Sequence, residues 1–286
     1  NKFAAAAAAP IILNLVLIIS LIFSFMYKLD YTKQLSFGVT LAGIIQLVFL
    51  IYVTKKFYKP GFNFNLRLSN KVKFFFKKLL PSVLSSGVTQ INILVGTIIA
   101  SFQSGAVSYL YYADRVYQIN LAIAGIAVGT VSLPVLSKAF KMKNVKKISD
   151  IQNKSFELSL LFSIPASFGL ILASNEIVNA LFGYGSFSQN DVEMTATALK
   201  FFGYGVPAFA LIKILSNFFF ARDNTKIPFY ISTFIVFLNI LISVFFFKKI
   251  GFIIIPIATS LSTWVGVFLY IILLNSKKIL LLKNQL

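Results

Sequence analysis

The feature that most constrains this 286-residue chain is a series of apolar stretches, each long enough to cross a bilayer, separated by short polar loops. A transmembrane helix needs about 20 apolar residues. Because a backbone in hydrocarbon must satisfy its own hydrogen bonds, such stretches fold as helices. The sequence therefore predicts an all-α polytopic membrane protein with about eight transmembrane helices. We place them at residues 10–28, 36–54, 79–101, 117–137, 156–174, 194–220, 229–247 and 252–274.

The composition excludes several classes of function. Hydrophobic residues make up 58% of the chain and charged residues 12%, against about 25% charged in soluble domains. With no cysteine and no histidine, the chain lacks the residues for thiol nucleophiles, disulfides, thiol or imidazole zinc ligands and imidazole acid–base catalysis. No predicted span holds two carboxylates. We therefore expect a protein that is not an enzyme and has no cofactor or metal site.

The charge pattern predicts an orientation. The formal net charge is +19, and the basic residues gather in every second loop, as they do in cytoplasmic loops. Residues 52–78 hold eight of them and no acid: Lys55, Lys56, Lys59, Arg67, Lys71, Lys73, Lys77 and Lys78. We expect a bacterial inner-membrane protein with both ends of this chain cytoplasmic. Its basic residues would contact anionic inner-leaflet lipids and no nucleic acid, since they lie between spans.

The basic loop has a second property. Bulky apolar residues alternate with basic ones over 62–78, so this stretch either lies along the inner leaflet as an amphipathic segment or is a solvated loop. We predict an amphipathic linker over 59–78, between a first part (1–58) with two helices and a second part whose main helices occupy 79–247. The last helix and a basic tail follow at 248–286.

Two spans carry residues that a lipid-facing helix would not. The third span is polar along about half of its circumference, so that side faces either a water-filled cavity or other helices. The next span has Gly125 and Gly129 at GxxxG spacing, which favours close helix packing. The polar residues of the third span include Ser82, Ser85, Ser86, Thr89, Gln90, Asn92, Thr97 and Ser101.

Asp114 and Arg115 are a charged pair that we place just ahead of the fourth span, on the outer side. Arg115 could extend to lipid headgroups or form a salt bridge with its neighbour. It could instead bind an anionic substrate, because a planar guanidinium suits phosphate groups. We favour substrate binding for this pair.

The sixth span and the turn after it are candidates for movement. Gly203, Gly205 and Pro207 lie within six residues, which predicts a kink or hinge. Lys213 lies in the same span and either reaches the cytoplasmic surface or faces a cavity. The following turn contains the charged residues Arg222, Asp223 and Lys226 and is either structural or a cytoplasmic gate.

Several motifs together resemble one family. The run Tyr-Tyr-Ala-Asp-Arg at 111–115 is followed by Gly-Thr-Val-Ser-Leu-Pro at 129–134, and later by Leu-Phe-Gly-Tyr-Gly at 181–185. In this order they resemble the lipid II flippase family (MurJ, formerly MviN) of bacterial peptidoglycan synthesis. The resemblance covers about residues 10–272.

The resemblance implies a fourteen-helix, two-lobed transporter of the multidrug/oligosaccharidyl-lipid/polysaccharide exporter superfamily. This chain would be its helices five to twelve, with the last two helices of the N-lobe at 1–58. The family's cavity arginine before the eighth helix corresponds to Arg115. Also implied is a monomer that flips lipid II, an undecaprenyl diphosphate-linked glycopeptide, by alternating access. Another polyprenyl-linked glycan, such as an O-antigen unit, is the alternative substrate.

Overall fold

A computed structural model describes residues 4–55, 72, 90–277 and 279–280. The described residues form helices and connecting turns, with no strand among them, and contacts divide the chain into two units, 1–73 and 74–286. The predicted linker 59–78 lies, apart from Val72, outside the described residues. Six stretches of these helices are long and apolar enough to cross a membrane, and the all-α polytopic fold is confirmed.

The first unit is a helical hairpin of α1 (Ala4–Tyr27) and α2 (Tyr31–Lys55). Asp30 begins α2, since its Oδ1 accepts from the backbone N–H of Thr32 at 2.9 Å. The helices approach closely at Gly38, where a Cβ would lie 2.6 Å from Ser20 Oγ. Both helices expose apolar side chains over most of their surface, as helices solvated by lipid do.

The second unit begins with a helical stretch over Gln90–Ala100 and continues in a long helix built of three segments. These are α4 (Ala106–Leu121), a π-helix, η1 (Ala122–Ala127), and α5 (Val128–Lys141). Next come α6 (Val145–Leu172) and the short α7 (Ser174–Phe182). The chain ends with α8 (Gln189–Phe220), α9 (Lys226–Ile250), a 3-10 turn, η2 (Gly251–Ile253), and α10 (Ile254–Ser276).

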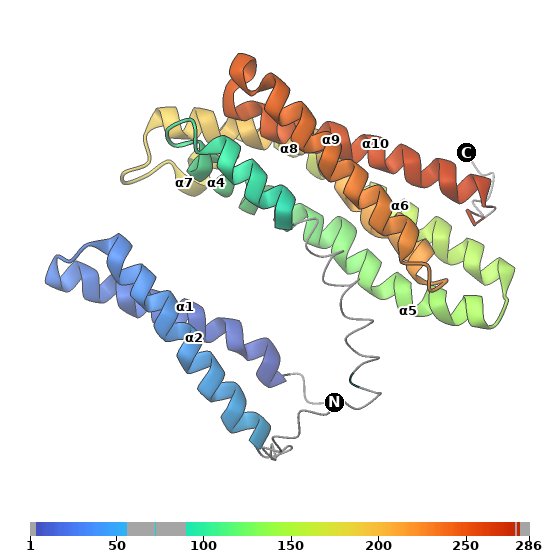
Figure 1. The fold of residues 1–286 in the computed structure, drawn as a ribbon, viewed down its shortest axis with the longest axis horizontal. Coiled ribbons are helices and arrows are strands. Elements are labelled where there is room, and N and C mark those ends of the chain that lie inside the picture. The colour runs from blue at the N-terminus through green and yellow to red at the C-terminus, as the bar shows by residue number, and fades with distance from the viewer. Residues whose placement is uncertain (1–3, 56–71, 73–89, 278, 281–286) are drawn as a thin grey trace. The chain divides into compact units, whose positions relative to one another are not determined.

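Helix α8 is the centre of this unit. It contacts α4, α5, α6, α7 and α10, and α9 and α10 form an antiparallel hairpin beside it (Figure 1). One apolar cluster surrounds the first half of α8 and includes Phe202, Val206 and Phe252. A second surrounds its last half and includes Phe218 and Tyr270.

We name the two ends of the second unit by what they hold. The α7 end holds Gly105, α7 and the Gly251 turn. The α5–α6 end holds the turn at 142–144, the α8–α9 turn at 221–225 and the end of α10.

Two sequence expectations are corrected here. The basic residues from 138 to 154 were assigned to a loop, but α5 runs to Lys141 and α6 begins at Val145. Asn144 caps α6 by accepting from the backbone N–H of Lys147. The lysines of this region therefore lie on helical turns that extend beyond the apolar span, except Lys143, which lies in the connecting turn. Helix α7 was not predicted, because it is too short to span a bilayer.

Candidate functional site

Asp114 and Arg115 lie inside α4, more than two turns after its first residue, and not ahead of the span as the sequence analysis placed them. The helix begins after Gly105, whose left-handed backbone (φ 76°) suits glycine. The span was drawn too short because the tyrosines and the charged pair lower the hydropathy of its first turns. The charged pair therefore belongs to the helix 106–141 that is long enough to cross the membrane.

The two charged side chains have separate partners. Arg115 Nη2 donates to the Tyr111 hydroxyl at 3.1 Å, and the guanidinium carbon lies 4.7 Å from the centre of that ring. The Asp114 carboxylate accepts from Gln118 Nε2 and also interacts with the Tyr117 hydroxyl. No salt bridge joins Arg115 to a carboxylate within the described residues, and its side chain is exposed. The guanidinium is therefore open to a further anionic partner.

Of the third predicted span, 79–101, the structure describes residues 90–101, which include part of its polar side. Gln90 and Thr97 are exposed and Asn92 is half-buried. Asn92 Oδ1 is shielded from solvent and accepts no hydrogen bond from a described residue. Residues 82–89, with the other polar positions, lie outside the described residues.

A neutral polar cluster joins α9 to α10. Asn239 Nδ2 donates to Thr259 Oγ1 at 2.9 Å, and Thr259 Oγ1 donates to the Ile255 carbonyl at 2.7 Å. Nearby on α9, Ser243 is buried with its hydroxyl unpaired among the described residues. No group of three or more Asp, Glu, His or Cys side chains that could hold a metal occurs in the described part of the chain.

The glycine and proline run of α8 is a tightly packed segment in a continuous helix. A Cβ at Gly203 would lie 3.1 Å from Ile171 Cγ1, and one at Gly205 would lie 2.5 Å from Ser260 Oγ. Pro207 has no N–H, so it cannot bond the carbonyl of Gly203. Ser167 Oγ donates to that carbonyl at 2.7 Å instead.

Lys213 lies two turns after Pro207 with an exposed side chain. Its backbone carbonyl lies 4.0 Å from a Cβ built at Gly129, so α5 and α8 approach closely there. Asn217 fixes the contact, because its Nδ2 donates to the Gly129 carbonyl at 2.8 Å. The two glycines at GxxxG spacing thus lie in a close helix contact, as predicted, and the structure shows that the partner is α8, with Gly125 against Ala210.

The α8–α9 turn brings its charged residues to the α5–α6 end. The guanidinium carbon of Arg222 lies 4.4 Å from the centre of the Phe140 ring. Partial desolvation lowers the pKa of Arg222, although the residue as a whole is exposed. Asp223 has a left-handed backbone (φ 56°), and Lys226 begins α9 with an exposed side chain.

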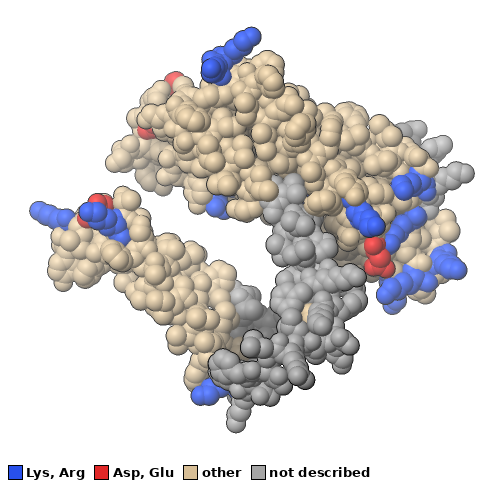
Figure 2. Space-filling view, in the orientation of Figure 1, with Lys and Arg blue, Asp and Glu red and all other residues tan. Residues whose placement is uncertain are grey.

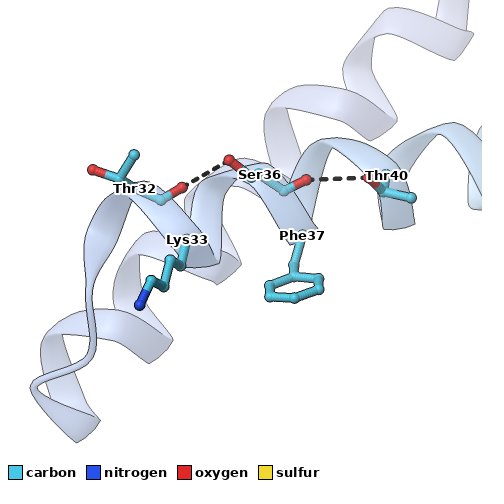
Figure 3. Close-up of a pocket in the computed structure, with 5 residues that line it drawn as sticks. All are labelled: Thr32, Lys33, Ser36, Phe37 and Thr40. Carbon is cyan, nitrogen blue, oxygen red and sulfur yellow. Dashed lines mark hydrogen bonds between the residues drawn. The ribbon is translucent and has the colours of Figure 1, made fainter.

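Sequence reasoning missed a polar stripe on α2, which borders a surface pocket (Figure 3). Ser36 Oγ donates to the Thr32 carbonyl at 2.9 Å and Thr40 Oγ1 to the Ser36 carbonyl at 3.2 Å. Lys33 and Phe37 complete the lining. The spacing of the hydroxyls by four residues was the signal that could have found it.

The sequence profile described as "Lipid II flippase MurJ" matches residues 1–285 of the chain. The chain belongs to this family. A probable lipid II flippase MurJ of Rhizobium tropici is 37% identical over 272 residues, which cover 93% of this chain and 50% of the relative. That of Rickettsia prowazekii is 37% identical over 268 residues, 92% of this chain and 52% of the relative. The chain spans about half the length of these MurJ relatives.

Solved structures agree with this assignment to the MurJ family. A structure titled "Lipid II flippase MurJ, inward closed conformation" matches with a TM-score of 0.82 and 29% identity, over 97% of this chain and 57% of that one. An inward-facing multidrug resistance MATE transporter of the MOP superfamily matches with a TM-score of 0.72 and 15% identity, over 87% of this chain and 58% of that one. The second match shows the fold alone. The family resemblance predicted from the motifs is confirmed.

Proposed function

We propose that the full-length protein flips lipid II from the cytoplasmic to the periplasmic leaflet of the bacterial inner membrane by alternating access. The family of the chain and the names of its relatives support this substrate over another polyprenyl-linked glycan. In a fourteen-helix monomer, residues 1–58 would be the last two helices of an N-lobe and 59–78 a linker. Residues 79–247 would be the main C-lobe helices, followed by the last helix and basic tail at 248–286.

The observation that carries the proposal is the state of Arg115. A charged side chain in a membrane helix is costly, and such residues face a bundle interior or an aqueous cavity. Arg115 has one tyrosine hydroxyl as its described partner and an exposed guanidinium. The diphosphate of lipid II is the kind of group that a guanidinium binds with two parallel hydrogen bonds.

The other candidate residues have supporting roles in this proposal. The half-buried Asn92, with Gln90, would give polar partners to the sugar and peptide groups, and Lys213 would attract the anionic headgroup. The Asp114 carboxylate would hold the surface of α4 beside Arg115 through Gln118.

Movement between inward and outward openings is assigned to α8 and the turn after it. Gly203, Gly205 and Pro207 would be the hinge, because proline removes one internal hydrogen bond of the helix. Arg222, Asp223 and Lys226 would form cytoplasmic gate contacts. The basic residues of the same end would contact anionic lipids of the inner leaflet.

Substitution of Arg115 in the full-length protein tests the proposal. In a strain depleted of its own flippase, we expect Arg115→Ala to abolish growth and to accumulate lipid II in the cytoplasmic leaflet, with the variant protein at normal abundance. Arg115→Lys keeps the charge without the planar fork and should restore part of the activity. Lys249→Ala, which removes an exposed charge at the end of α9, is the matched control and should grow normally. Normal growth of Arg115→Ala would refute the proposal, and accumulation of a different glycolipid would refute the substrate.

A further inference from the structure

We infer that Asp191 is a positioning residue: by holding Tyr109, it fixes the rotation of α4 about its own axis and so directs Arg115 away from the core. The inference rests on the proposed role of Arg115 in binding the substrate. Asp191 itself lies at the start of α8 and is not assigned to contact the substrate.

The first observation is the set of partners around the Asp191 carboxylate. Oδ1 accepts from the Tyr109 hydroxyl at 2.8 Å, which joins α8 to α4. Oδ2 accepts from the backbone N–H of Ser188 at 2.8 Å and from its hydroxyl at 2.7 Å. All three groups donate, so the site suits a carboxylate, which only accepts. An amide in its place would keep only one acceptor oxygen and would lose the charge that strengthens these hydrogen bonds.

The second observation concerns how α4 begins and ends. Gly105 precedes the helix with a left-handed backbone, and the π-helix η1 follows it. The π-helix η1 offsets the angular position of α4 from that of α5 within one continuous helix, so the contacts that α4 itself makes add to those of α5 in defining its rotation. The Tyr109 ring covers Gly105, where a Cβ would lie 2.6 Å from the ring.

The third observation is the smooth buried face of α4. Ala106 and Ala113 are fully buried and Val116 is nearly so. Because these side chains are small, they offer little resistance to rotation of α4 about its own axis. Three tyrosines add definition: Tyr109 through Asp191, Tyr117 through its ring, 4.7 Å from the centre of the Phe202 ring, and Tyr112 through its ring, 4.9 Å from the centre of the Phe182 ring.

Rotation of α4 decides where Arg115 points. Arg115 follows Tyr109 by six residues, which is about 240° around a helix with 3.6 residues per turn. Tyr109 faces the core cluster while Tyr111 and Arg115 are exposed on the other side. If α4 turned about its axis by the angle between successive residues, about 100°, the Arg115 guanidinium would no longer point away from the core.

Two spin labels on a cysteine-free full-length protein measure this rotation without relying on transport. Ile119 on α4 and Leu172 at the end of α6 are exposed and make none of the contacts above, so each can be replaced by a labelled cysteine. We expect Asp191→Asn and Tyr109→Phe to shift and broaden the distance distribution between the labels in the same way. The double variant should add nothing further, because both changes remove one contact.

Controls separate this contact from the helix cap and from general loss of structure. Ser188→Ala removes the capping hydroxyl but keeps Tyr109 on Asp191, and Glu193→Gln removes an exposed acid two positions further along α8. Both should leave the distance unchanged, and Asp191→Glu should restore most of it. An unchanged distance in Asp191→Asn, or an equal shift in Ser188→Ala, would overturn the inference.

Lipid II transport by the same variants completes the test. We expect Asp191→Asn and Tyr109→Phe to lower the transport rate about tenfold, as for loss of a hydrogen bond to a charged group. Arg115→Ala should abolish transport with the label distance unchanged. If Arg115→Ala transports normally, the proposed function fails while the effect of Asp191 on the distance stands. If the distance is insensitive to Asp191 and Arg115→Ala is inactive, only this inference fails.

Discussion

At the scale of single residues, Gly205 shows how little space α8 leaves to its neighbours. A Cβ at this position would lie 2.5 Å from both Ser260 Oγ and Phe209 Cζ. The serine cannot withdraw freely, because its hydroxyl donates to the Phe201 carbonyl at 2.7 Å. By contrast, a Cβ built at Gly169 in α6 would have no such neighbour within 4 Å.

These two glycines make a matched pair for a stability measurement. We expect Gly205→Ala to lower the free energy of unfolding by about 1–3 kcal/mol, as for overpacking of a tight core. Gly169→Ala should be neutral or slightly stabilising, since alanine favours the helix where there is room. Unfolding in mixed micelles would measure both, and equal effects would contradict the close packing at Gly205.

The residue scale also shows a limit of the sequence. Arg115 was found from its chemistry, since an arginine among apolar residues needs a reason to be there. Its hydrogen bond to Tyr111 and its exposure depend on the helix that contains it. The sequence analysis began that helix at residue 117, whereas α4 begins at Ala106. Asp191 was not singled out at all, because its hydrogen bond to Tyr109 joins positions far apart in the chain.

At the scale of the element, backbone carbonyls of α8 accept hydrogen bonds from side chains of two neighbouring helices, α6 and α10. Three of its carbonyls, those of Phe201, Gly203 and Tyr204, accept hydrogen bonds from Ser260 Oγ, Ser167 Oγ and Trp264 Nε1, respectively. All three precede Pro207 by at most six residues. The Gly203 carbonyl, which loses its helical donor at Pro207, is therefore compensated from α6, as expected for a backbone in hydrocarbon. The two bonds from α10 are additional, because the Phe201 and Tyr204 carbonyls do not face Pro207.

A double-mutant cycle tests this compensation. Ser167→Ala alone should cost about 1 kcal/mol of unfolding free energy, because the Gly203 carbonyl loses its donor. After Pro207→Ala, the new N–H of residue 207 can bond that carbonyl, and Ser167→Ala should then cost almost nothing. Ser216→Ala removes a hydroxyl that donates to a carbonyl of its own helix and should show no coupling to Pro207. Additive effects of Ser167→Ala and Pro207→Ala would contradict the assignment.

The sequence predicts where the membrane-spanning helices lie better than it predicts the residues at which they begin and end. A stretch such as 194–220 is apolar enough to be recognised in isolation, and α8 contains it. Its first turn was missed because it is a polar capping box, formed by Ser188 and Asp191. Hydropathy detects the lipid-exposed length of a helix, while helices continue beyond it into water.

At the scale of the second unit, charge is distributed unevenly between the two ends. Basic residues gather at the α5–α6 end (Figure 2). The α7 end carries three acids, Glu176, Asp191 and Glu193, together with Lys248 and Lys249. The α5–α6 end also carries the acids Asp150 and Asp223, but its basic residues outnumber them, so the asymmetry supports a cytoplasmic α5–α6 end. The basic residues there are Lys138, Lys141, Lys143, Lys146, Lys147, Arg222, Lys226 and Lys277.

Single cysteines test this orientation, because the chain has none of its own. Met142 in the α5–α6 turn and Tyr184 in the α7–α8 loop are both well exposed. We expect Tyr184→Cys to react with a membrane-impermeant maleimide in intact spheroplasts and Met142→Cys to react only after permeabilisation. The reverse pattern would contradict the positive-inside prediction.

The sequence by itself determined that the chain crosses a membrane several times and to which family it belongs. Both follow from local information, since a helix in lipid satisfies its backbone within its own segment and the motifs are short runs. The tertiary structure decided which helices meet and where side chains point. Lipid provides little hydrophobic drive between helices, so contacts depend on small residues and on single hydrogen bonds between distant positions. Bonds such as Asn217 to the Gly129 carbonyl or Tyr109 to Asp191 exist only once α8 lies against α4 and α5.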